Sequence, residues 1–131
     1  MKSRDSSIRL KRFQVDERRK RLAQLEMMIA DFARISAELD REIAHEEKRA
    51  GITDVNHFAY PTYARAAMGR RDNLNRSADE LKTQLDEARA ALDEALAELE
   101  KAENLEGRER GVENRAERAM SFGMALQAAR A

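Results

Sequence analysis

Apolar side chains recur at alternating spacings of three and four residues in two long stretches of the chain. A seam of this kind, sustained over about five heptads, is the signature of a coiled coil. A short break separates the two stretches and leads into the only proline, Pro61. The chain is therefore expected to turn back on itself at the break. The first seam consists of Ile8, Val15, Leu22, Leu25, Ile29, Phe32, Leu39 and Ile43, and the second of Ala64, Ala67, Leu74, Ala78, Leu81, Leu85, Ala88, Leu92, Ala95, Leu99 and Ala102.

Start and stop signals place the ends of two helices. Ser6 or Ser7 can accept hydrogen bonds from the free amides of a first turn, and Gly51 is a usual stop residue. Pro61 is tolerated at a first helical position because its missing N–H is not needed there. The sequence therefore predicts an all-α fold, a long antiparallel two-helix coiled-coil hairpin. Its predicted parts are a first helix at about residues 7–49, a tip at 50–60 and a second helix at about 61–106.

The C-terminal part of the chain departs from this pattern. The seam decays beyond Leu105, and Gly107 and Gly111 weaken any helix that contains them. We therefore expect the hairpin to occupy residues 1–106, and residues 107–131 to form a weakly ordered or separately helical tail that is flexible or partly helical.

The composition favours extended helices and excludes some classes of protein. Charged residues make up 38% of the chain and aromatic residues 5%, which suits long solvated helices and cannot fill a thick core. The chain has no cysteine, and no apolar run approaches the roughly 20 residues that a membrane span needs. A cytoplasmic protein without direct membrane insertion is expected.

Opposite charges are concentrated in opposite parts of the chain. Residues 1–22 hold nine basic and three acidic residues, whereas residues 79–109 hold eleven acidic and four basic. These segments lie side by side in an antiparallel hairpin. The zero net charge therefore indicates internal complementarity.

Charged residues that interrupt the seams predict the register. In an antiparallel pair the numbers of facing residues have a constant sum, and the heptad phases allow 110 or 117. A sum of 117 brings Lys11 to Glu106 and Glu46 to Arg71, whereas a sum of 110 sets these charges against apolar side chains. Because an unpaired charge in an apolar layer costs several times what an exposed pair contributes, the sum of 117 is favoured. It also predicts the flanking pairs Arg12–Glu103, Arg21–Glu98 and Glu26–Arg89, and the layers Leu25–Leu92, Ile29–Ala88 and Phe32–Leu85.

The sequence offers little chemistry for catalysis or metal binding. Glu42 and His45 have the Glu-x-x-His spacing of four-helix di-iron proteins, but such sites need a second motif and two more Glu, and the second helix offers none. His45 also falls on the outer face, and His57 has no partner fixed by the sequence. No phosphate-binding loop or nucleophile elbow is present. We therefore predict no catalytic residue, no metal, no cofactor and no enzymatic activity.

Basic residues cluster in the first helix. A basic helix that leads into heptads is typical of leucine-zipper DNA binders. Here, however, the apolar heptads already run through the basic stretch, and Asp16 and Glu17 interrupt it. We therefore expect no nucleic acid, and a solvated face that can contact a protein partner. The candidate residues are Arg9, Arg12, Arg18, Arg19, Lys20 and Arg21.

The tip holds the candidate binding surface. Phe58, Tyr60 and Tyr63 are three of only six aromatic residues in the chain. Aromatic side chains are enriched among interface hot spots, and with Arg65 and Met68 these would form a cohesive patch. The alternative is that the rings cap the hairpin by packing on neighbouring isoleucines and on one another.

The tip also carries a family resemblance. It is found in Gly51-Ile52-Thr53-Asp54, in His57-Phe58-Ala59-Tyr60-Pro61-Thr62-Tyr63-Ala64, in Arg70-Arg71-Asp72-Asn73-Leu74 and in the opening Ile8-Arg9-Leu10-Lys11-Arg12-Phe13. Together these segments resemble one branch of the bacterial flagellar export protein FliJ family, over roughly residues 1–106.

This resemblance implies a non-catalytic component of the flagellar type III export apparatus, folded as an antiparallel two-helix coiled coil. Members of the family bind the export ATPase ring and the cytoplasmic domain of the export gate FlhA, help to couple the two, and recycle export chaperones. The implied location is cytoplasmic, peripheral to the inner membrane at the flagellar base.

A second class of function is a self-assembling scaffold. Met28 and Ile35 flank the first seam and leave apolar surface that a second copy could cover. Two hairpins would then form a homodimeric four-helix bundle.

Overall fold

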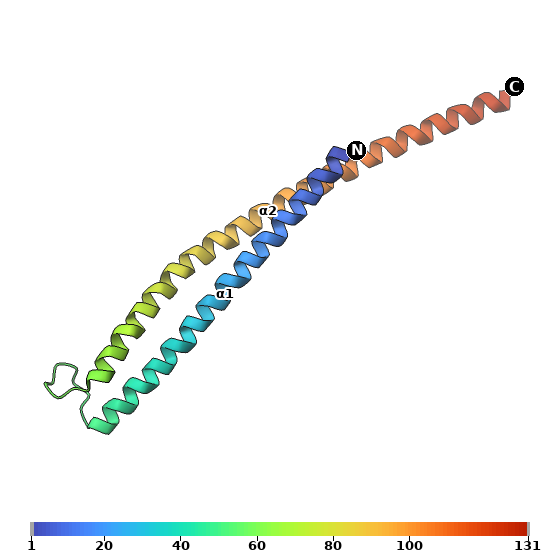
Figure 1. The fold of residues 1–131 in the computed structure, drawn as a ribbon. Helices are drawn as coiled ribbons and strands as arrows, with labels where there is room; N and C mark the ends of the chain where they lie inside the picture. Colours follow the sequence, from blue (N-terminus) through green and yellow to red (C-terminus); the bar gives the residue numbers. More distant parts are fainter. Residues whose placement is uncertain (1, 131) are drawn as a thin grey trace. The chain divides into compact units, whose positions relative to one another are not determined.

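The computed structural model describes residues 2–130 and contains two helices and no strand in that range. Helix α1 spans Lys2–Ala50 and helix α2 spans Thr62–Arg130 (Figure 1). The helices pack against each other in antiparallel directions, which confirms the predicted helical hairpin. Two compact units result, one of Arg19–Ala91 and one that combines residues 1–18 with 92–131.

Local signals explain how the helices meet the tip. Gly51 adopts a φ of 71°, which is a left-handed conformation that favours glycine, and its N–H donates to the carbonyl of Glu47 at 2.9 Å. Ile52 donates to the same carbonyl at 3.3 Å, so α1 ends as predicted. At the start of α2, the N–H of Arg65 donates to the carbonyl of Pro61 at 3.1 Å. Pro61 therefore directly precedes the second helix.

The outer ends of both helices differ from the prediction. α1 is already helical at Lys2, ahead of the serines expected to begin it. α2 does not end near residue 106 but continues through Gly107 and Gly111, neither of which has a positive φ. The cost of each glycine, about 1 kcal/mol, lowers the stability of a helix without interrupting it. The part of residues 107–131 that the structure describes is therefore one continuous extension of α2.

Each unit has its own core. In the unit Arg19–Ala91, Leu25 is 1% exposed and clusters with Leu81 and Leu85. Nearer the tip a second cluster forms from Leu39, Ile43, Tyr60, Ala64 and Ala67. In the other unit, Ile8, Val15 and Ala95 are buried.

The predicted register is wrong by one heptad. Leu25 packs with Leu85, a pair whose numbers sum to 110, and not with Leu92. The Ser36 hydroxyl lies 2.8 Å from Asn75 Oδ1, and Arg71 donates to Asp40 at 3.0 Å, with sums close to the same value. These contacts lie in the unit Arg19–Ala91. In the other unit, Lys11 lies 3.8 Å from Glu98, a pair whose numbers sum to 109.

The charges that favoured the other register find different partners. Lys11 keeps 30% of its side chain exposed while it reaches Glu98, and Arg71 contacts Asp40 and Asp72. Long charged side chains can lay their apolar stems on a seam while their charged ends stay in water. The register with a sum of 110 therefore does not bury an unpaired charge, which was the reason to expect the sum of 117. Glu46 lies 4.0 Å from Arg49 and Glu106 pairs with Arg110, each on its own helix.

One flanking pair is found and another is replaced. Arg12 contacts Glu103 at 3.5 Å, as predicted. Arg21 donates instead to Gln84 at 3.1 Å. Exposed pairs of this kind contribute little, about 0–1 kcal/mol each, so they do not select a register.

Cysteines introduced at Leu25 and Leu85 are expected to form a disulfide, because these side chains face each other in the core. The pair Leu25 and Leu92 is the matched control and is expected to stay reduced under the same oxidising conditions. Mobility on non-reducing gels measures both, without interference from native cysteine. Efficient cross-linking of the control pair would favour the other register.

Candidate partner-binding site at the hairpin tip

The loop between the helices is held by its own hydrogen bonds. Asp54 accepts from the N–H of Asn56 through Oδ1 and from the N–H of His57 through its carbonyl, both at 3.0 Å. His57 then accepts from the N–H of Ala59 through Nδ1 and from the N–H of Tyr60 through its carbonyl, also at 3.0 Å. An Asx turn and a second turn follow each other directly. The loop therefore has a defined backbone before any partner binds.

Tyr60 anchors this loop to the hairpin. Its ring is 5% exposed and belongs to the same cluster as Ile43, and its hydroxyl lies 3.8 Å from the sulfur of Met68. The guanidinium of Arg65 lies 5.4 Å from the ring centroid and donates to the carbonyl of Val55 at 2.8 Å. Desolvation of the phenol raises the pKa of Tyr60. Tyr60 and Met68 thus support the tip from within, as the capping alternative predicts for Tyr60, and are not part of a cohesive outer patch.

Phe58 occupies the outer side of the loop. It is 96% exposed and stacks on the ring of His57, with ring centroids 4.8 Å apart and an interplanar angle of 21°. The residues on either side, His57 and Ala59, are joined by the hydrogen bond described above. Phe58 is therefore a large apolar side chain presented to solvent from a backbone that is already ordered. Binding through such a side chain loses less conformational entropy than binding through a mobile loop.

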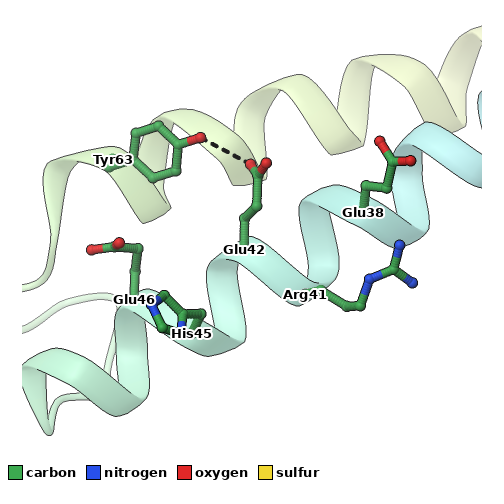
Figure 2. Close-up of a pocket in the computed structure, with 6 residues that line it drawn as sticks. All are labelled: Glu38, Arg41, Glu42, His45, Glu46 and Tyr63. Carbon is green, nitrogen blue, oxygen red and sulfur yellow. Dashed lines mark hydrogen bonds between the residues drawn. The ribbon is translucent and has the colours of Figure 1, made fainter.

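Tyr63 belongs to a different surface. Its hydroxyl donates to Glu42 at 2.9 Å, across a groove that is also lined by Glu38, Arg41, His45 and Glu46 (Figure 2). This hydrogen bond raises the pKa of Tyr63. Glu42 of the Glu-x-x-His pair is thereby engaged by a phenol. Within residues 2–130, no group of three or more His, Cys, Asp or Glu side chains is arranged to hold a metal ion.

The basic residues of α1 are exposed but not all of them are free. Arg12 and Arg21 are tied to α2 by the contacts with Glu103 and Gln84, and Lys20 also has a partner. The role of this stretch in partner binding stays a prediction. The exposed basic residues are Arg9, Arg12, Arg18, Arg19, Lys20 and Arg21.

The structure reveals one pair of residues that the sequence analysis missed. Ser36 is buried and is hydrogen-bonded to Asn75 in the middle of the apolar seam. A polar layer of this kind fixes register in coiled coils because any slip leaves its groups unpaired. The signal was present, since Ser36 continues the spacing of three and four between Phe32 and Leu39.

The search for relatives does not identify a family. Comparisons with protein-family models, with curated proteins and with solved structures found no match to this chain. The resemblance to the FliJ family therefore stays a prediction from the motifs of the tip. None of the helices described within residues 2–130 has a stretch both long and apolar enough to cross a membrane.

Proposed function

We propose that this chain is a non-enzymatic adaptor of the flagellar type III export apparatus, in which it links the export ATPase ring to the export gate and assists the delivery of chaperones and substrates. The partners proposed are the ATPase ring, the cytoplasmic domain of FlhA and export chaperones. The location proposed is the cytoplasmic side of the inner membrane, at the flagellar base. Support comes from the helical hairpin and from the tip motifs that resemble the FliJ family.

The observation that carries an adaptor role is the exposure of Phe58 on an ordered loop. A fully exposed phenylalanine contributes nothing to the hydrophobic core. Central aromatic side chains supply a large share of binding energy at protein interfaces. We assign Phe58 as the side chain that inserts into the gate, and Tyr60 as the residue that positions the loop behind it.

The alternative scaffold function needs the apolar surface beside the first seam, and only part of that surface is exposed. Met28 is 42% exposed, and the neighbouring Met27 is also exposed. Ile35 is only partly buried and packs against the cluster of Leu39 and Ile43. Part of the apolar surface that such a four-helix bundle would use is thus already covered within one chain.

Replacement of Phe58 by alanine is expected to weaken binding to the FlhA cytoplasmic domain about 30-fold, a loss of about 2 kcal/mol that is typical of an aromatic hot spot. Calorimetry or surface plasmon resonance measures the Kd. The matched control is Phe13→Ala, which removes another exposed phenylalanine far from the tip in sequence. It is expected to leave the Kd unchanged.

Two outcomes would contradict the proposal. Equal affinity of the wild type and Phe58→Ala would exclude the tip as the site. A wild-type chain that co-purifies with neither the export ATPase nor the FlhA domain would remove the flagellar function itself.

A further inference from the structure

The packing seam of α2 runs on beyond the start of α1. In the unit that combines residues 1–18 with 92–131, Arg4 forms ion pairs with Glu109 and Glu113. Glu113 is the last residue of α2, among those described, to which α1 is joined by an ion pair. Figure 1 shows α2 continuing past the N-terminal end of α1. Among the described residues, none of α1 lies beside the later turns of α2, where residues 112–122 are all exposed.

The spacing of three and four residues is kept in this extension. From Ala102 and Glu106 it continues through Glu109 and Glu113 to Ala116, Met120, Gly123 and Gln127. The face formed by Ala116, Met120, Gly123 and Gln127 is called the extension seam below. It continues the interface that α2 makes with α1, and it is the position that a further antiparallel helix would cover.

The extension seam and its flanks are apolar and uncovered. Met120 is 68% exposed, and the flanking Val112, Met124 and Leu126 are exposed as well. Residues 119–129 include no charged side chain. A Cβ atom built on Gly123 would meet nothing within 4 Å, so the seam has an open notch at this position. Large apolar side chains that lie exposed next to one another are a feature of interaction sites.

The extension seam is complementary to itself. When two copies run antiparallel so that facing residue numbers sum to 243, Met120 lies opposite Gly123 of the second copy, and Ala116 lies opposite Gln127. Large side chains then face small ones, which is the arrangement that lets helices interdigitate. In this arrangement Arg130, the last residue that the structure describes, lies opposite Glu113, to which Arg4 of α1 is paired.

We propose that the C-terminal extension of α2 is a homodimerisation site, at which the extension seams of two copies pack antiparallel about a twofold axis. Such an interface is isologous, so each copy covers the same residues of the other. The proposal is independent of the adaptor function and of the tip. It differs from the four-helix bundle through Met28 and Ile35, which would bury another part of the hairpin.

A second copy fits this surface better than a lipid surface does. Ala116 and Gly123 present little apolar area to a bilayer, whereas small residues let a second helix approach closely. The polar Gln127 continues the seam and has no counterpart in a lipid-facing stripe. The charges next to the seam also mix Arg115 and Arg118 with Glu117, whereas anionic lipid favours a basic polar face.

The test is the oligomeric state of the full chain. Sedimentation equilibrium is expected to show a reversible monomer–dimer equilibrium of the wild type. Met120→Glu should weaken dimerisation at least about tenfold, because it buries a charge in the seam. The matched control Ser121→Glu adds the same charge to the neighbouring exposed position and should dimerise like the wild type. Far-UV circular dichroism of both variants verifies that the hairpin is intact.

The register has a separate test, which the absence of native cysteine makes simple. A mixture of Met120→Cys and Gly123→Cys chains should form the mixed disulfide, in preference to a disulfide between two Met120→Cys chains. A dominant disulfide between identical positions would mean parallel pairing and would overturn the arrangement.

The remaining outcomes also decide against the proposal. A wild-type chain that stays monomeric at all concentrations overturns it. So does a dimer that Met120→Glu leaves intact. Sedimentation of the monomer with vesicles of anionic phospholipid, but not with vesicles of neutral phospholipid, would identify lipid as the occupant of the seam in place of a second copy.

Discussion

Replacement of Tyr60 by alanine is expected to lower the free energy of unfolding by about 3–5 kcal/mol, the usual cost of removing a buried aromatic ring. The ring is buried at the point where the loop joins the cluster of Ile43 and Ala64. Its removal would leave a cavity and would also free the guanidinium of Arg65 from its position over the ring. Urea unfolding followed by circular dichroism at 222 nm measures the change.

Phe58→Ala is the matched control, because it removes an aromatic ring two residues away that is almost wholly exposed. Its effect on the free energy of unfolding should stay within about 0.5 kcal/mol, as for most surface substitutions. Together the two variants separate the positioning role of Tyr60 from the contact role assigned to Phe58. Equal destabilisation by both would mean that Phe58 packs within the fold.

Replacement of Leu25 by alanine is expected to destabilise the hairpin by about 3 kcal/mol. Leu25 is the largest side chain that is fully buried among the described residues, and it packs between Leu81 and Leu85. A two-helix hairpin has only one layer of contacts, so no second layer can move into the space. Thermal and urea unfolding of the purified chain measure the loss.

Leu10→Ala is the control for this variant. It removes the same atoms from the same helix at a position that is more than half exposed. Its expected effect on the free energy of unfolding is below about 0.5 kcal/mol. A cost for Leu25→Ala as small as this would show that Leu25 is not held in a seam against α2.

The tip illustrates how far sequence reasoning reaches at a candidate site. The sequence places three aromatic residues at or beside the loop. The capping interpretation holds for Tyr60, and the interpretation as a binding surface stays a prediction. Tyr60 is buried, Phe58 is exposed, and Tyr63 faces a groove beside Glu42. The turns formed by Asp54 and His57 place Phe58 and Tyr60, whereas Tyr63 lies in the first turn of α2. Composition holds no information on these placements.

The register shows a second kind of limit. Two registers one heptad apart satisfy the same apolar spacing, so the choice rested on the cost of burying charges. The predicted register places the charges of Lys11 and Arg71 within the seam. Their long side chains instead reach Glu98 and Asp40 at its edge, and the polar layer of Ser36 and Asn75 adds a further preference.

The sequence by itself determined the local features of this protein. These are two amphipathic helices, the end of the first helix at Gly51 and the start of the second after Pro61, and together they produce a hairpin. These follow from periodicity and from backbone restrictions that act over a few neighbouring residues. The tertiary structure alone decided the register and the burial of Tyr60. Each of these depends on contacts between residues far apart in sequence, or on small differences among competing packings, and the energy of such contacts is not encoded in any one segment.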